Sequence, residues 1–92
     1  MAPLKIAIVE DEADILEVLR YNLHREGFSV TTAVDGAAGL DQIRREMPDL
    51  VLLDLMLPGM GGIDICRHLK ASETTKSIPI IMVSAKGEEG DV

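Results

Sequence analysis

Four short apolar runs alternate along the chain with longer segments of mixed polarity. The runs cover residues 4–9, 28–33, 50–53 and 79–83, and aliphatic side chains dominate them. Their length and β-branched content predict strands. The runs 4–9 and 50–53 are continuously apolar, which is typical of strands buried on both faces of a sheet. The run 28–33 is half polar and is expected to lie at a sheet edge.

The segments between these runs carry apolar residues at helical spacing and predict three amphipathic helices. In the first helix, the apolar stripe consists of Ile15, Leu16, Leu19 and Leu23. The second is expected to start at the N-cap Asp35 and to stop before Pro48. Its side chains expected to point inward are Ala37, Leu40, Ile43 and Met47. The third follows a glycine-rich loop at 57–62.

The resulting order, β-α-β-α-β-α-β, predicts a parallel sheet, because each connection is long enough to contain a helix. In open parallel sheets, binding sites form outside the carboxyl ends of the strands. The residues at those ends are Glu10, Asp11, Asp54 and Ser84. Three carboxylates and one hydroxyl are therefore expected to converge on one crevice.

Composition narrows the class of protein. The 92 residues suffice for one domain, and a hydrophobic fraction of 47% excludes intrinsic disorder. The net charge of −7 disfavours direct nucleic-acid binding, which requires clustered basic residues. The single cysteine, Cys66, cannot form an internal disulfide, and the chain shows neither a signal-peptide pattern nor a membrane-spanning apolar run. We therefore expect a cytoplasmic α/β domain that makes no membrane contact.

The three converging acids require an explanation, because two like charges about 4 Å apart repel by about 4 kcal/mol at an effective dielectric constant near 20. Either a cation bridges the carboxylates, or one of them holds a proton. A few carboxylate oxygens with room for water and phosphate suit Mg²⁺ better than zinc. With a metal present, Asp54 becomes a candidate nucleophile toward phosphorus, and Ser84 a hydrogen-bond donor to a phosphoryl oxygen.

Three sequence motifs carry a family resemblance. They are IVEDE at 8–12, LLDLMLPGMGG at 52–62 and IMVSA at 81–85. In order and spacing, they resemble the receiver domain of two-component response regulators, over essentially the whole chain. The amino-acid sequence of these motifs is most similar to that of receivers attached to winged-helix DNA-binding domains, of the phosphate-regulon type. The resemblance implies a flavodoxin-like, doubly wound α/β fold with strand order 2-1-3-4-5.

The resemblance also implies roles for individual residues. Asp54 matches the phosphoacceptor, and Ser84 matches the hydroxyl that moves toward the phosphoryl group. The implied Mg²⁺ ligands are Asp11 directly, Glu10 mainly through water, Asp54, and the backbone carbonyl of Met56. Pro58 and Gly62 match the loop that leads the chain away from the site.

The implied phosphodonor is a phosphohistidine on a sensor histidine kinase. The receiver would help catalyse its own phosphorylation and dephosphorylation, without being a conventional enzyme. Phosphorylation would switch an output domain, of the transcriptional kind, that this chain does not contain.

The chain departs from the family pattern at its carboxyl end. It stops at Val92, inside the expected fourth helix, so the domain at 1–92 would lack the fifth strand, its catalytic lysine, its switch aromatic residue and the fifth helix. Lys86 is no substitute for that lysine, because it follows the fourth strand. Impaired catalysis is expected. The strand at 79–83 would form an exposed apolar edge, which predicts self-association.

Three other functions compete with the receiver hypothesis. A phosphorylation-independent interaction module would need the fold alone, and the shortened chain is its best candidate. A flavin-binding domain of the same topology is disfavoured because the acids at 10–12 would repel the flavin phosphate. A Mg²⁺-dependent phosphatase would need a second acid two residues after the nucleophile, where this chain has Met56.

Overall fold

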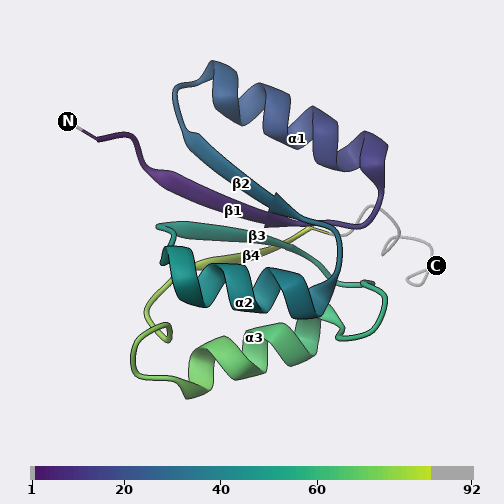
Figure 1. Ribbon diagram of the computed structural model, residues 1–92, viewed down its shortest axis with the longest axis vertical. Helices are drawn as coiled ribbons and strands as arrows, with labels where there is room; N and C mark the ends of the chain where they lie inside the picture. The colour runs from purple at the N-terminus through teal and green to yellow at the C-terminus, as the bar shows by residue number, and fades with distance from the viewer. Residues whose placement is uncertain (1, 84–92) are drawn as a thin grey trace.

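The computed structural model describes residues 2–83 of the chain and consists of a sheet covered by three helices (Figure 1). The strands are β1 (Lys5–Val9), β2 (Ser29–Ala33), β3 (Leu50–Asp54) and β4 (Ile80–Val83). The helices are α1 (Ala13–Arg25), α2 (Gly36–Glu46) and α3 (Gly62–Ala71). Every predicted strand and helix is therefore present, with boundaries shifted by one or two residues.

All four strands are parallel and stand in the order β2-β1-β3-β4. This confirms the predicted α/β, flavodoxin-like fold, with the half-polar β2 at one edge and β1 and β3 in the interior. Helix α1 lies on one face of the sheet, and α2 and α3 lie side by side on the other (Figure 1). A fifth strand is not seen within residues 2–83.

The continuously apolar strands form the centre of the core, as predicted. Side chains of β1 and β3 are almost inaccessible to solvent, among them Ile8, Val9, Val51 and Leu53. From α2 and α3, Ile43, Ile65 and Leu69 are fully buried in one cluster with Val9, Val51 and Leu53. Burial of an aliphatic side chain stabilises the fold by about 1.5–3 kcal/mol. This core fixes the ends of β1 and β3, from which the acidic residues extend.

Helix α1 is the least buried of the three helices. None of its residues is fully buried, and its apolar stripe is only half covered by the part of the chain that the structure describes. Val18, next to the stripe, is 59% exposed. The periodicity therefore predicted the inward face of α1 correctly, and Leu16, Leu19 and Leu23 on that face are only partly covered, as expected for this chain.

The inward face of α2 differs from the prediction. The buried positions of this helix are Gly36, Gly39, Leu40 and Ile43. Ala37 is exposed because the two glycines take the inward positions one turn apart. Met47 is also exposed, because it follows the helix as its C-cap in the left-handed conformation, which turns its side chain out of the helical stripe.

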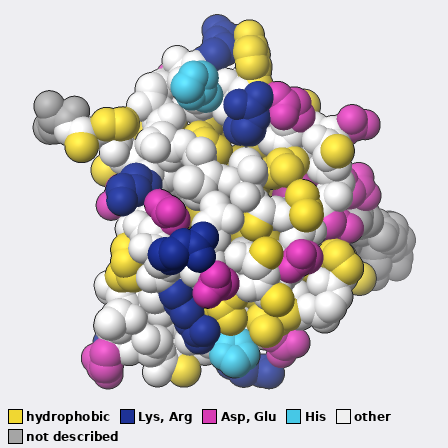
Figure 2. All heavy atoms as spheres, in the orientation of Figure 1, with side chains coloured by type: hydrophobic (Ala, Val, Ile, Leu, Met, Phe, Trp, Pro, Cys, Tyr) yellow, Lys and Arg dark blue, Asp and Glu magenta, His cyan; other side chains and the backbone are white. Residues whose placement is uncertain are grey.

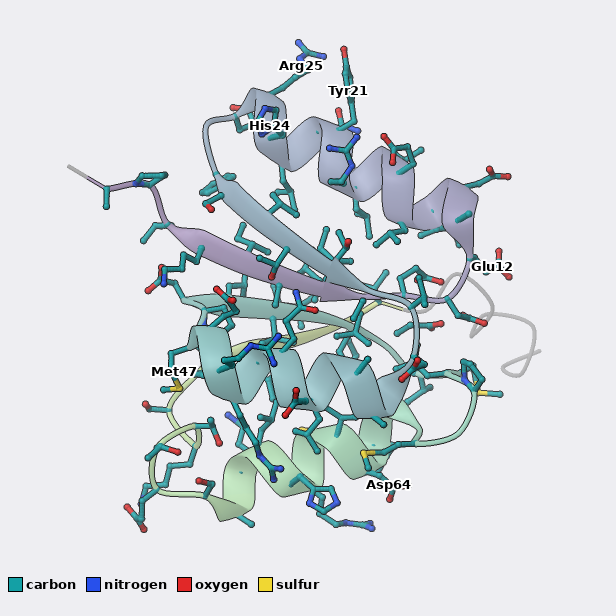
Figure 3. All side chains as sticks on the ribbon, viewed as in Figure 1. Glu12, Tyr21, His24, Arg25, Met47 and Asp64 are labelled. Carbon is teal, nitrogen blue, oxygen red and sulfur yellow. The ribbon has the colours of Figure 1, made fainter. Side chains whose placement is uncertain are left out.

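Met47 has a φ of 50°, a conformation that side chains with a Cβ adopt at a cost. It lies at the end of α2 distant from the carboxyl ends of the strands (Figure 3). We expect Met47→Gly to raise the free energy of unfolding by about 1 kcal/mol, because glycine adopts this conformation without steric strain. Urea denaturation of the variant measures the gain. Met47→Ala is the matched control, which keeps the strain and should show no gain; equal stabilisation by both substitutions would contradict the argument.

Candidate functional site

Three carboxylates meet at the carboxyl end of the sheet. Glu10 and Asp54 are buried, with 3% and 2% of their surfaces exposed, while Asp11 is exposed. One carboxylate oxygen from each of the three lies within 4.8 Å of the others. The predicted convergence of these residues is therefore confirmed.

The parallel pairing of β1 with β3 explains this arrangement. Val9 lies opposite Leu53 in the sheet, so the residues that follow them, Glu10 and Asp54, are also neighbours. The amide of Glu10 donates to the carbonyl of Ala33 at 3.0 Å, which ties the end of β1 to β2 as well. The core thus holds two acidic side chains where electrostatics alone would separate them.

The two oxygens of Asp54 differ in their surroundings. Oδ1 accepts a hydrogen bond from the amide of Met56 at 3.3 Å. Oδ2 is buried and has no hydrogen-bond partner among the described residues. A buried carboxylate oxygen without a partner is costly, because burial removes its water without replacing it. A divalent cation would satisfy Oδ2 and offset the repulsion between the three acids, so the donor set fits Mg²⁺.

The turn that follows β1 stabilises the carboxylate of Glu10. Its Oε2 accepts a hydrogen bond from the amide of Glu12 at 3.0 Å. Burial nevertheless raises the pKa of Glu10 above its ordinary value of 4.5, and repulsion from Asp54, Asp11 and Glu12 acts in the same direction, whereas the bond from the Glu12 amide lowers it. The protein without a bound cation therefore holds a proton on Glu10 more tightly than the unfolded chain does.

This raised pKa predicts how stability depends on pH. Between 4.5 and the raised pKa, the folded state binds more protons at Glu10 than the unfolded state, so this group makes stability fall as pH rises. Glu10→Gln removes that contribution and is expected to stabilise the metal-free protein at pH 7 by about 1 kcal/mol. Denaturation in EDTA across pH 4 to 8 would test this. If the free energy of unfolding changed with pH in the same way in the wild type and in Glu10→Gln, the prediction would be contradicted.

The loop between β3 and α3 lies next to Asp54. Leu57 of this loop is buried, and the amide of Gly62 donates to the carbonyl of Leu55 at 3.1 Å, which closes the loop at its base. Pro58 is exposed, whereas Gly62 is buried at the start of α3. This loop therefore leads the chain off the site as predicted from the motif.

Other predicted site residues have different outcomes. Met56 has an exposed side chain and contacts the site through its backbone, whereas the metal role of its carbonyl stays a prediction. Ser84 lies outside the described residues, and so does Lys86. Among the described residues, the site therefore consists of the three acids and the backbone around them.

Two contributions to the site were not predicted. The amide of Glu12 holds Glu10, and Gly36 allows α2 to approach the loop at Met60. Figure 3 shows Glu12 just after β1, at the same end of the sheet as the start of α3. In the sequence, the acid-rich turn directly after a strand is a signal for the contact between Glu12 and Glu10. The glycine directly after a helix N-cap is a weaker signal for the contact between Gly36 and Met60.

Comparison with known proteins identifies the family. Residues 6–92 match the model of the response regulator receiver domain. The chain belongs to this family.

The relatives that it resembles include transcriptional regulators. The chain is 47% identical over 87 residues to the phosphate regulon transcriptional regulatory protein PhoB of Rhizobium meliloti, covering 95% of this chain and 38% of that protein. It is 45% identical over 87 residues to the alkaline phosphatase synthesis transcriptional regulatory protein PhoP of Bacillus subtilis, covering 95% of this chain and 35% of that protein. The chain thus spans less than two fifths of the length of these relatives.

Solved structures confirm the fold. The receiver domain of a sensor histidine kinase from Pseudomonas aeruginosa, which has a magnesium ion coordinated in its active-site cleft, superimposes with a TM-score of 0.89 at 31% identity. The match covers 98% of this chain and 74% of that one. The N-terminal domain of a response regulator receiver protein from Methanoculleus marisnigri matches with a TM-score of 0.85 at 35% identity, over 90% of this chain and 68% of that one.

Proposed function

We propose that this receiver domain accepts a phosphoryl group on Asp54 in the presence of Mg²⁺. The observation that carries the proposal is the buried Oδ2 of Asp54, which has no partner among residues 2–83 and lies in a cluster with Glu10 and Asp11. The ligands we propose for Mg²⁺ are Asp11, Glu10 mainly through water, Asp54 and the carbonyl of Met56. The ion would neutralise charge on the phosphoryl oxygens.

In the proposed reaction, an oxygen of Asp54 forms a bond to phosphorus while the bond between phosphorus and a histidine nitrogen of the donor breaks. The leaving imidazole keeps the electron pair and takes up a proton. The amide of Met56, already bonded to Oδ1, fixes the orientation of the Asp54 carboxylate. Glu10 and Asp11 would hold the ion, and the hydroxyl of Ser84 is proposed to bind a phosphoryl oxygen. The domain would also promote hydrolysis of its acyl phosphate.

The proposal is tested by adding acetyl phosphate or phosphoramidate, with and without Mg²⁺, to the longest natural protein that contains this chain. We expect a base-labile mass gain of one phosphoryl group, located at Asp54 by peptide mapping and lost in EDTA. No mass gain under any condition would overturn the proposal and favour a phosphorylation-independent interaction module.

A sensor histidine kinase is the proposed donor, and the proposed output is transcriptional. The support is similarity to the phosphate-regulon regulators, whose remaining length this chain does not match.

We propose that the receiver itself does not bind nucleic acid. On the face that Figure 2 draws, basic and acidic side chains are interspersed rather than gathered into a basic stripe. Among the described residues, no helix is long and apolar enough to cross a bilayer. A cytoplasmic location, typical of the family, is proposed.

We also propose that the 92-residue chain self-associates through β4. Within the described residues β4 is an edge strand, and its Ile81 and Met82 are 51% and 39% exposed. An exposed apolar edge offers unpaired backbone groups to another strand. Sedimentation of this chain is expected to show larger species as concentration rises, and Ile81→Lys should reduce them. A single monomeric species at every concentration would contradict the proposal.

A further inference from the structure

The loop between β3 and α3, residues 55–61, is held from several sides. Its Leu57 is 8% exposed and belongs to the core, and Met60 packs against that core. At its start, the amide of Met56 bonds to Oδ1 of Asp54. A shift of this loop would therefore move the hydrogen bond that orients the Asp54 carboxylate.

Helix α2 touches this loop at Gly36, the first residue of the helix. A Cβ at position 36 would lie 2.1 Å from the carbonyl oxygen of Met60 and 2.9 Å from its Cβ. Real Cβ atoms essentially never approach other atoms so closely, and the nearer of the two atoms is backbone. Contact between the loop and α2 thus requires that residue 36 have no side chain.

The helix is the less movable of the two partners. Its N-cap Asp35 accepts a hydrogen bond from the amide of Ala38 at 2.8 Å, and Leu40 and Ile43 anchor it in the core. The loop has one deeply buried side chain, Leu57, and exposed residues on both sides of it, Met56 and Pro58. A side chain at position 36 would therefore displace the loop more than the helix.

We infer that Gly36 is a positioning residue for the metal and phosphoacceptor site. Because residue 36 lacks a side chain, the loop rests on α2, and this contact sets the position of the Met56 backbone beside Asp54. The atoms nearest to a Cβ at position 36 all belong to Met60, and none belongs to the three carboxylates. The inference rests on the proposed function only in assuming that the acid cluster takes Mg²⁺.

The test compares the Mg²⁺ affinity of the wild type with that of its variants, each made in the longest natural protein that contains this chain. Titration calorimetry measures the affinity at a temperature where every protein is folded. We expect Gly36→Ala to weaken Mg²⁺ binding about 10-fold, as expected for loss of support around a metal site. Ile43→Ala is the control, because it destabilises the same helix from a fully buried position about two turns beyond Gly36. Its thermal midpoint should fall while its Mg²⁺ affinity stays within about twofold of wild type.

Leu57→Ala is the second variant and releases the loop from its other anchor. It should weaken Mg²⁺ binding as Gly36→Ala does, and it decides the question if Gly36→Ala does not fold. If the wild-type protein binds no Mg²⁺, the proposed function fails, and this inference fails with it. If the wild-type protein binds Mg²⁺ and the loop variants bind it as tightly, or if Ile43→Ala weakens binding equally, only the positioning role of Gly36 is overturned.

Discussion

Asp54→Asn is expected to abolish acceptance of a phosphoryl group, lowering the labelling rate by about a thousandfold or more. The amide of asparagine cannot act as the nucleophile that a carboxylate oxygen provides. The fold should persist, because asparagine has nearly the same volume and its oxygen can still accept the hydrogen bond from the Met56 amide. Intact-protein mass spectrometry after incubation with phosphoramidate and Mg²⁺ measures the loss.

The matched control for this variant is Asp64→Asn, the same chemical change at an exposed residue in the first turn of α3 (Figure 3). Within residues 2–83, Asp64 forms an exposed ion pair with Arg67, at 3.6 Å, and such a pair contributes little to stability. Asp64→Asn should therefore be labelled like the wild type. Labelling of Asp54→Asn at the wild-type rate would show that another group accepts the phosphoryl.

Gly62→Ala is expected to lower the free energy of unfolding by about 3 kcal/mol, at the upper end of the usual effect of overpacking. A Cβ at this position would lie 2.4 Å from the carbonyl oxygen of Asp54 and 3.0 Å from the Cα of Leu55. These are backbone atoms at the end of an interior strand, so they cannot rotate away as a side chain would. Thermal and urea denaturation measure the effect.

The adjacent residue offers a close control. Gly61 has an ordinary backbone conformation, with a φ of −73°, and a Cβ there would meet only the Leu55 carbonyl oxygen, at 3.9 Å. Gly61 is the N-cap of α3 and makes no side-chain cap bond that the substitution could remove. Gly61→Ala should therefore lower the free energy of unfolding by less than about 1 kcal/mol. Equal losses from the two substitutions would mean that the close approach at Gly62 does not limit stability.

The strands could be predicted because their burial leaves a direct mark on the sequence. A run such as 50–53 has no polar side chain to place in water, and the structure buries Val51 and Leu53 completely. Helix faces were harder to predict, because apolar periodicity does not register glycine. In α2 the inward positions include Gly36 and Gly39, where neighbouring residues approach the helix too closely for a side chain. The apolar periodicity predicted Ala37 as an inward position instead.

The acidic cluster could be predicted because parallel strands bring their carboxyl ends to one edge, and the residues after Val9 and Leu53 are acids. The contacts that orient these acids could not be predicted. The bond from the Met56 amide to Asp54 and the approach of α2 to Met60 depend on backbone positions set by tertiary packing. Sequence patterns describe side chains and carry little information about such contacts.

The position of β1 has a consequence for synthesis. Of the four strands in this sheet β1 is made first, yet it pairs with β2 on one side and β3 on the other. A nascent chain leaving the ribosome can pair β1 with β2 early, but the opposite edge of β1 stays open until residues 50–54 have emerged. Because Asp54 is the last residue of β3, a growing chain has no complete acid cluster until translation has passed that strand.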